Sequence, residues 1–243
     1  MFDDSATVYS LDPVRPKDYD EVAEKTIDKI PTGNFAQNIL FMWLMLKALW
    51  KLIFYPKPRV LCYRIKQAEV ERIKSLQGRR VSTNDVINTW FFNLHKFKYG
   101  ELLMNMRNRV PGCNADKAGA YINVGQVFKK DFETPAAHRE ALEGMLSKQR
   151  GPFKANWSFN TGGLSTSWTG FYKDIKIDGL IQYMHCPIED VDVMKLGCLP
   201  LCTEAYITIF KYDENETGLY IIDWTYGIID YDKCDILGER LFD

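Results

Sequence analysis

The chain has 243 residues, of which 46% are hydrophobic and 14% aromatic, and its formal net charge is −1. This composition can supply a sizeable core, so it excludes a globally disordered chain, and the length suits one large domain or two small ones. The near-zero charge gives no bulk electrostatic reason to expect a nucleic-acid partner, since such proteins usually carry a basic surface. The 6 cysteines are scattered, which favours free thiols in a reducing compartment over a disulfide scaffold or a metal site.

Residues 34–56 are unusually apolar, with an unbroken hydrophobic run over residues 39–46. Lys47 and Lys51 follow one helical turn apart, so an amphipathic helix here would have a broad apolar face and a narrow basic stripe. Three placements stay open: a helix packed on the domain, a helix lying in a membrane surface, and a spanning helix. The two lysines disfavour the span, which wants about 20 apolar residues without central charges.

The domain layout follows from these stretches. We interpret residues 1–58 as a crossover or linker that contains the 34–56 helix, and residues 59–243 as one α/β domain. Apolar alternation predicts strands and a 3.6-residue apolar period predicts helices. The expected elements are a short helix over 19–30, a strand over 59–65, a helix over 67–77, a helix from 82, strands over 105–109 and 120–124, a helix over 134–149, a bent strand over 164–178, a strand over 180–187, a hairpin of 204–212 and 218–224, and a closing helix over 230–242.

Residues 81–125 carry most of the functional information. Ser82 and Asp85 predict a helix start, because a short hydroxyl side chain accepts from free N–H groups of the first turn and a carboxylate is favoured at the positive end of the helix dipole. The apolar residues that follow have helix spacing and are expected to be buried: Val86, Ile87, Trp90, Phe91 and Leu94. We interpret Arg79 and Arg80, just before this helix, as a solvated loop in preference to a phosphate contact.

A strand over 105–109 is expected after this helix, with Arg107 and Arg109 on one face. Two adjacent cations on a sheet repel each other unless they are paired. Asp85 and Asp116 are the candidate partners.

The order of these pieces resembles the second half of the acyl-CoA-dependent acyltransferases built on the chloramphenicol-acetyltransferase fold, of which the BAHD and the alcohol or wax-ester acyltransferases are two-half versions. The segment Asn105-Met106-Arg107-Asn108-Arg109 is similar to a family strand with the pattern Asn/Asp-x-Arg-x-Arg, and residues 118–123 are similar to a segment that usually reads Gly, aromatic, Gly-Asn. The resemblance implies an α/β two-layer sandwich, a half-domain with a mixed sheet flanked by helices. It also implies a substrate channel lined by Asn84, Asp85, Asn105, Arg107, Arg109 and Tyr121.

A second similarity concerns the segment Ser167-Trp168-Thr169-Gly170-Phe171. Trimeric acetyltransferases of this fold carry Pro-Trp-x-Ser-Phe, whose serine hydroxyl stabilises the oxyanion of the tetrahedral intermediate. Gly170 stands at the serine position here, so the donor would be Thr169, Ser167 or a backbone N–H. Ser165-Thr166-Ser167 also looks like the Ser-Thr-Ser of carnitine acyltransferases. The implied oxyanion and tunnel residues are Ser167, Trp168, Thr169 and Gly170.

The catalytic His-x-x-x-Asp-Gly motif of that family is absent, because none of His95, His138 and His185 is followed by Asp-Gly at the required spacing. His138 is expected on the exposed second turn of its helix. In the two-half enzymes the motif ends the first half, so the resemblance implies that this chain begins after the catalytic histidine. It would then be a C-terminal fragment, a truncated gene product or a non-catalytic relative.

The implied function is acyl transfer from an acyl-CoA co-substrate to a hydrophobic alcohol, with no permanently bound cofactor and no metal. The alternative is a non-catalytic binding or scaffold protein that keeps the fold and associates with a membrane through residues 34–56. A lone half would expose the apolar face between the halves, so we expect a homodimer or a separate N-terminal half-domain as partner. The expected location is the cytoplasm or the cytoplasmic face of a membrane.

Overall fold

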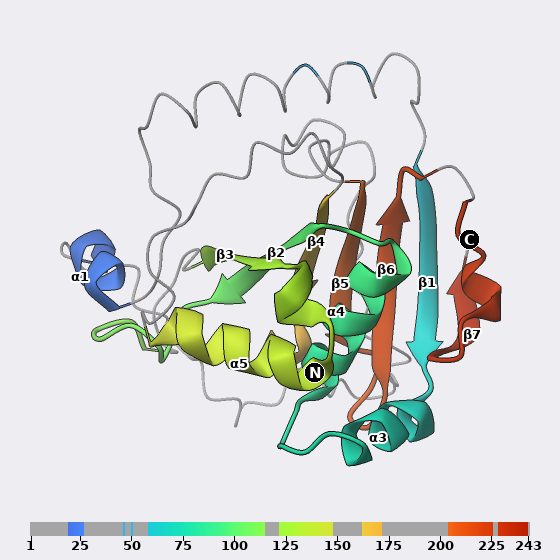
Figure 1. Ribbon diagram of the computed structural model, residues 1–243, viewed down its shortest axis with the longest axis horizontal. Coiled ribbons are helices and arrows are strands. Elements are labelled where there is room, and N and C mark those ends of the chain that lie inside the picture. Colours follow the sequence, from blue (N-terminus) through green and yellow to red (C-terminus); the bar gives the residue numbers. More distant parts are fainter. Residues whose placement is uncertain are drawn as a thin grey trace, which may run out of the picture.

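The computed structural model describes residues 19–26, 46, 50, 58–114, 122–147, 162–171, 204–225 and 228–242. Within these residues, seven strands form one mixed sheet in the order β3-β2-β4-β5-β6-β1-β7 (Figure 1). β4 runs parallel to both of its neighbours, β2 and β5, and the other neighbouring strands pair antiparallel. The strands are β1 (Arg59–Ile65), β2 (Tyr99–Asn105), β3 (Ile122–Phe128), β4 (Gly162–Ser167), β5 (Ala205–Lys211), β6 (Thr217–Asp223) and β7 (Leu237–Phe242).

Helices form the second layer on one face of this sheet, where α4 and α5 lie side by side and α3 packs against α4 (Figure 1). The described helices are α1 (Tyr19–Thr26), α3 (Gln67–Ser75), α4 (Thr83–Leu94) and α5 (Pro135–Leu146), with short 3₁₀ turns at Lys129–Phe132, Thr169–Phe171 and Tyr231–Lys233. The predicted α/β class with a mixed sheet flanked by helices is therefore confirmed.

The sheet is apolar on both faces, as β5 illustrates. Ile207 and Ile209 join the core under the helices, whereas Tyr206 and Phe210 join a separate cluster on the other face. This split follows from the two-residue period of a strand. A strand buried on both faces reads as a continuous apolar run, which explains why residues 204–212 predict a strand without showing alternation.

One glycine of β4 shapes the core under α4. A Cβ atom added at Gly163 would lie 2.4 Å from Cε2 of Phe97 and 2.9 Å from Cε1 of Phe91, and both rings are buried. The missing side chain therefore lets two aromatic rings pack directly onto the strand.

Several predicted elements are confirmed, namely β1, α3, α4, α5 and the β5–β6 hairpin. Thr134 caps α5 by accepting from the Ala137 N–H at 3.1 Å, with Pro135 in the first turn. The helix expected over 19–30 is present as α1, and the strand expected near 120–124 is present as β3.

The strand expected over 105–109 is wrong. β2 ends at Asn105, and residues 107–109 form a turn in which Asn108 has φ of 61°. The Asn105 side chain accepts from the Arg107 N–H at 3.0 Å, so the asparagine hydrogen-bonds its own backbone two residues on and ends the strand. Arg107 and Arg109 therefore do not share a strand face.

The closing helix expected over 230–242 is also wrong. Only Tyr231–Lys233 is helical, as a 3₁₀ turn, and the chain continues as β7, which pairs antiparallel with β1. Strand pairing with the edge of the sheet outweighs the local helix preference of this segment.

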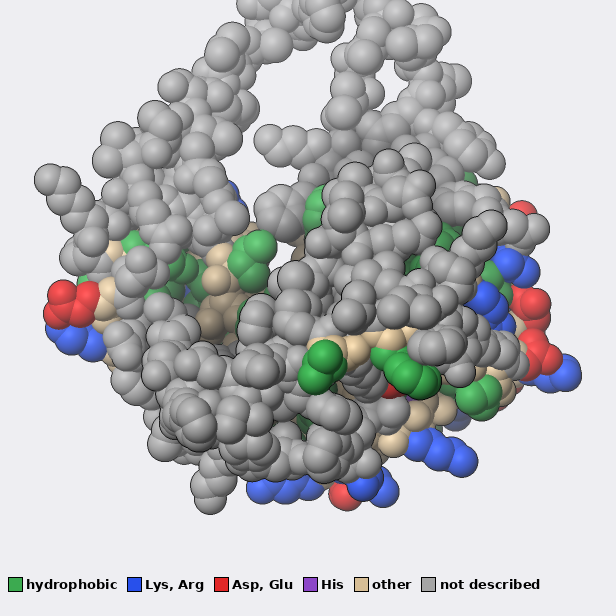
Figure 2. Space-filling view, turned by 90° about the horizontal axis from the view of Figure 1, so that it is seen from above, with side chains coloured by type: hydrophobic (Ala, Val, Ile, Leu, Met, Phe, Trp, Pro, Cys, Tyr) green, Lys and Arg blue, Asp and Glu red, His purple; other side chains and the backbone are tan. Residues whose placement is uncertain are grey.

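Charged side chains of opposite sign lie next to one another along the rim of the face in Figure 2, which agrees with the near-zero net charge. Leu46 and Trp50, the two described residues of the apolar segment 34–56, are helical and exposed. No helix in the described part of the chain is long and apolar enough to cross a bilayer. The rest of 34–56, the strand expected over 180–187, Asp116, Tyr121 and His185 lie outside the described residues.

Candidate active site

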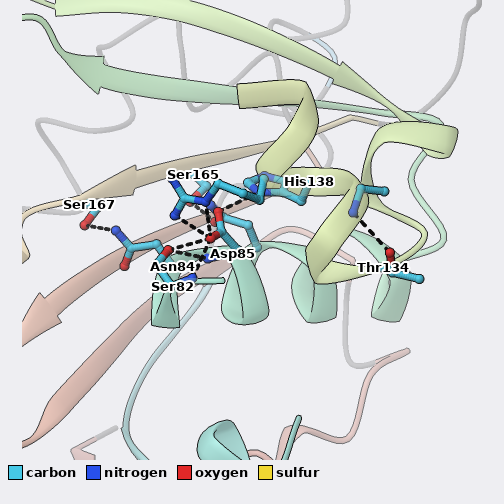
Figure 3. Close-up of polar contacts among 10 residues, drawn as sticks. Ser82, Asn84, Asp85, Thr134, His138, Ser165 and Ser167 are labelled. Atoms are coloured by element: carbon cyan, nitrogen blue, oxygen red, sulfur yellow. Dashed lines mark hydrogen bonds and ion pairs between the residues drawn. The ribbon is translucent and has the colours of Figure 1, made fainter. Parts of the chain in front are cut away.

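The N-terminus of α4, the last residues of β4 and the first turns of α5 meet on the helix side of the sheet (Figure 3). α4 supplies Ser82 as its N-cap, followed by Asn84 and Asp85, and β4 supplies Ser165 and Ser167. Polar side chains from three elements thus gather in adjacent groups, which we call the network. The network has a buried half around Asp85 and an accessible half around Ser167.

Asp85 is the centre of the buried half, with no exposed surface. It closes a capping box: the Ser82 N–H donates to Asp85 Oδ2 at 2.6 Å, and the Asp85 N–H donates to Ser82 Oγ at 3.2 Å. Arg139 of α5 donates to the same Oδ2 from both Nε, at 2.9 Å, and Nη2. The Nδ1 atom of His138 lies 3.2 Å from Oδ1.

These donors decide the charge of Asp85. Burial by itself would raise the pKa of this carboxyl, but the hydrogen bonds from His138 and Ser82 and the charge of Arg139 outweigh burial and hold the pKa below its usual value. Asp85 is therefore an anion at neutral pH. Because a carboxylate only accepts, His138 must carry its proton on Nδ1, which leaves Nε2 as a buried nitrogen without a partner.

The expectation that His138 is a surface residue is wrong, since its side chain is fully buried. Asp85, expected to line the channel, is also fully buried and cannot touch a substrate. It is paired with Arg139 and His138, which replaces the pairing with Arg107 or Arg109 expected from the sequence.

The accessible half is a line of three polar groups. The Asn84 Nδ2–H donates to Ser167 Oγ at 2.9 Å, and Ser167 Oγ lies 3.0 Å from Thr169 Oγ1. All three side chains are half-buried. Because Ser167 Oγ accepts from Asn84, the Ser167 O–H can donate a hydrogen bond to Thr169 Oγ1, and the Thr169 O–H is then free to donate outward. The structure thus brings together one residue expected in the channel and two expected at the oxyanion.

A second hydrogen bond between an asparagine of α4 and a serine of β4 lies deeper between the two elements. Ser165 donates to Asn88 Oδ1, and both side chains are buried. Asn84 and Asn88 are four residues apart on a helix, about 6 Å along the axis, and Ser165 and Ser167 are two apart on a strand, about 6.6 Å. The two spacings match, so two asparagine–serine hydrogen bonds lie side by side and join α4 to β4.

A groove of about 1020 Å³ opens beside this network, between α3, the loop before α4, and α5. Four cationic and two acidic side chains contribute to its walls. The lining residues are Glu71, Lys74, Ser75, Arg79, Arg80, Val81, Ser82, Thr83, Arg139 and Glu143. Arg80 is exposed and has no partner among the described residues, whereas Arg79 pairs with Glu143 at 2.6 Å.

The other predicted site residues lie as follows. Trp168 is half-buried against the core cluster on the far face of the sheet, and its backbone N–H donates to the Ile209 carbonyl at 2.7 Å. Gly170 is exposed in the 3₁₀ turn after β4. Arg107 is half-buried and Arg109 is exposed, both in the turn that follows Asn105.

Sequence reasoning missed Arg139, Asn88 and the role of Ser165 in this network. The matched spacings of Asn84 with Asn88 and of Ser165 with Ser167 are a signal in the sequence, but they become informative only once α4 is known to lie on β4. Nothing in the sequence connects Arg139 to Asp85, which stands 54 positions earlier.

A second buried cluster lies at the other end of α4. His95 Nε2 is 2.8 Å from the hydroxyl of Tyr231, and the imidazole stacks on Phe97 with ring centroids 4.7 Å apart. Burial, assisted by the nearby Arg59 charge, lowers the pKa of His95 to about 4. Asp223 is buried beside it and accepts from Arg59 at 2.6 Å. The His95 imidazole is therefore neutral at neutral pH.

No protein-family model matches the chain, and no curated protein matches it. Solved structures are similar to it at low identity. Vinorine synthase is 11% identical with a TM-score of 0.48, over 68% of this chain and 43% of that one. TRI101 of F. graminearum, complexed with ethyl coenzyme A, is 12% identical with a TM-score of 0.41, over 68% and 45%.

The first condensation domain of the CDA synthetase is 13% identical with a TM-score of 0.41, over 73% of this chain and 43% of that chain. The chain therefore spans less than half the length of these three structures. The α/β fold class stands on the chain's own sheet and helices.

Proposed function

We propose that this chain forms one wall of an acyl-transfer site, in which the acyl group of a CoA thioester passes to a hydrophobic alcohol. The observation that carries the proposal is the line of donors Asn84, Ser167 and Thr169 at the accessible end of the α4–β4 contact. The similarity of residues 81–125 and 167–171 to the acyl-CoA-dependent acyltransferases supports the same conclusion.

In this reaction the acceptor oxygen attacks the thioester carbonyl and a C–O bond forms. The carbonyl oxygen takes up negative charge until the C–S bond breaks and CoA leaves as a thiolate that takes a proton. Thr169, held by Ser167 and through it by Asn84, would donate to that oxyanion. Donors that are already oriented need no reorganisation during the reaction, and one such donor is worth about 10²–10³ in rate.

The acceptor proton needs a base, and neither described histidine can supply it. His138 is fully buried, and His95 is hydrogen-bonded to Tyr231 and stacked on Phe97. The proposal therefore assigns the base to another part of the complete site. Its source would be a separate N-terminal half-domain, a second copy of this chain, or a residue of this chain outside the described ranges.

The groove beside the network is the proposed site for the phosphates of CoA. Guanidinium groups suit phosphate because they are always charged and can donate two parallel hydrogen bonds. Arg80 is exposed and unpartnered among the described side chains, and Arg139 is held toward the groove by Asp85. Both Arg79 and Arg80 lie exposed in the loop before α4, as expected from the sequence, and the proposed phosphate contact is added to that placement.

His138 is fully buried and His95 is half-buried and bound to Tyr231, which favours a second candidate function, a non-catalytic protein that binds acyl-CoA and keeps the fold. The hydrophobic alcohol, and a membrane surface as the place where it is met, stay proposals that rest on the apolar segment 34–56.

The test is to titrate the full chain with CoA by calorimetry and then to follow thiol release from a fatty acyl-CoA with a long-chain alcohol present, with imidazole added to supply the general base that the described part of the chain lacks. We expect binding, and a loss of thiol release of at least about tenfold in Thr169→Val with unchanged CoA affinity. Ser147→Ala removes an exposed hydroxyl from the end of α5 and serves as the control. CoA binding without thiol release would favour the non-catalytic candidate, and absence of CoA binding would refute both.

A further inference from the structure

Two of the carboxylates that touch cations of the groove, Asp85 and Glu143, differ in how firmly they are held. Asp85 has no exposed surface and is bound by Ser82, His138 and Arg139. Glu143, in contrast, is 55% exposed and bound to Arg79 at 2.6 Å, and Arg79 is itself 38% exposed. One carboxylate is therefore a permanent part of the wall, while the other can leave its partner at little cost.

The Arg79–Glu143 pair joins opposite walls of the groove. Arg79 belongs to the loop between α3 and α4, and Glu143 lies on α5, 64 positions later in the chain. Both residues line the groove, so the Glu143 carboxylate occupies a place where an anionic ligand would meet Arg79. An exposed ion pair contributes about 0–1 kcal/mol, which a phosphate can replace by charge-assisted hydrogen bonds to the same guanidinium.

We propose that Glu143 is an internal competitor that sets the affinity and the selectivity of this groove for phosphate-bearing ligands. Glu143 neutralises Arg79 in the free protein and must move away when an anion enters. A ligand with several negative charges gains enough from Arg79 and Arg80 to displace the carboxylate, whereas a singly charged anion gains less. The inference rests on the proposed phosphate site.

Lys74 lies on the other side of the groove and is also paired with an exposed carboxylate. It pairs with Glu71 at 2.8 Å, and the Glu71 carboxylate is 56% exposed. These two residues are neighbours on α3 with an i,i+3 spacing, so their pairing does not bridge the walls. Only the Arg79–Glu143 pair, among the described ion pairs of the groove, links the loop before α4 to α5, and we assign the competitor role to Glu143 alone.

The experiment is calorimetric titration of the full chain with adenosine 3′,5′-bisphosphate and with inorganic pyrophosphate at fixed ionic strength. Glu143→Gln keeps the size of the side chain and a hydrogen-bond acceptor for Arg79 but removes the charge. We expect it to bind both probes about 3- to 10-fold more tightly, because a neighbouring negative charge is lost at a partly exposed site. Glu133→Gln removes an exposed carboxylate just before α5 and away from the groove lining, and its affinity should equal that of the wild type.

Arg80→Gln tests the groove independently and should weaken the binding of both probes. If Glu143→Gln binds no more tightly than the wild type while Arg80→Gln weakens binding, the groove takes phosphate and only the competitor role is refuted. If Glu133→Gln tightens binding as much as Glu143→Gln, the effect is one of overall charge and the role is again refuted. If neither probe binds the wild type or any variant, the proposed phosphate site is refuted as well.

Discussion

Replacing Asp85 by asparagine should be among the most damaging conservative changes in the described part of the chain. The carboxylate receives donors only, from Ser82, His138 and Arg139. An asparagine of the same shape would turn an NH₂ group toward at least one of these donors. Arg139 would lose the charge that faces it, and His138 would stay fully buried with a weaker acceptor.

The size of the expected stability loss in Asp85→Asn follows from the buried charge that stays unpaired. Removing one partner of a buried ion pair costs about 3–5 kcal/mol, because the remaining charge is left uncompensated. Arg139 is 27% exposed, so water relieves part of that cost, and we expect a loss near 3 kcal/mol. A chain of this size has m of about 3 kcal/mol per molar urea, so the unfolding midpoint should fall by about 1 M.

Urea unfolding of the wild type, Asp85→Asn, Arg139→Gln and the double variant measures this directly. The double-mutant cycle should give a coupling of about 1–3 kcal/mol between the two residues. Asp230→Asn is the matched control, since Asp230 is paired with Lys233 at the surface and should change stability by about 0.5 kcal/mol or less. A loss below about 1 kcal/mol in Asp85→Asn would refute the argument that the network depends on this charge.

The lowered pKa of Asp85 also predicts how the free energy of unfolding changes at acid pH. The pKa of Asp85 is lower in the folded chain than its usual value, because hydrogen bonds and the Arg139 charge outweigh the opposing effect of burial. The unfolded chain therefore takes up this proton first as the pH falls, so the stabilisation is complete above about pH 4 and is lost below it. Asp85→Asn should flatten the pH dependence of unfolding in that range.

Three further changes test other parts of the structure. His95 has a pKa of about 4 in the folded chain against an ordinary value of 6.5, so the unfolded state binds the His95 proton first as the pH falls. The free energy of unfolding should therefore fall by about 3 kcal/mol between pH 6.5 and 4. His95→Gln should remove this pH dependence in thermal melts. Gly163→Ala forces a Cβ into two buried phenylalanine rings and should cost about 1–3 kcal/mol by urea unfolding, whereas Gly78→Ala, with nothing within 4 Å, should not. Ser165→Ala leaves Asn88 with an unpaired buried oxygen and should cost about 1–3 kcal/mol; a neutral result would contradict the α4–β4 contact.

Much of the fold could be predicted, and the successes share a physical basis. Ser82 and Thr134 mark helix starts because an N-cap needs only a backbone N–H two or three residues ahead. The β5–β6 hairpin follows from two apolar runs separated by a short polar loop. Each of these signals is complete within a few residues of sequence.

The failures share a basis too. Asn105 ended a strand by bonding to the Arg107 backbone, so the alternation that follows it is not a strand signal. The segment expected to close the chain as a helix pairs as β7 with β1, whose edge was available only after the sheet had formed. The burial of His138 cannot be predicted from its own helix, because the exposure of a helix face depends on what packs against it.

Short-range patterns in the sequence indicate most of the helix starts, the apolar faces of the strands and the polar character of the segments at α4 and β4. Only the tertiary structure decided which of those polar groups meet. Asn84 reaches Ser167, 83 positions later, because β4 is inserted between β2 and β5 and α4 lies across it. Caps and alternation are short-range properties of the chain, whereas a site depends on strand order, and strand order is set by the packing of the whole domain.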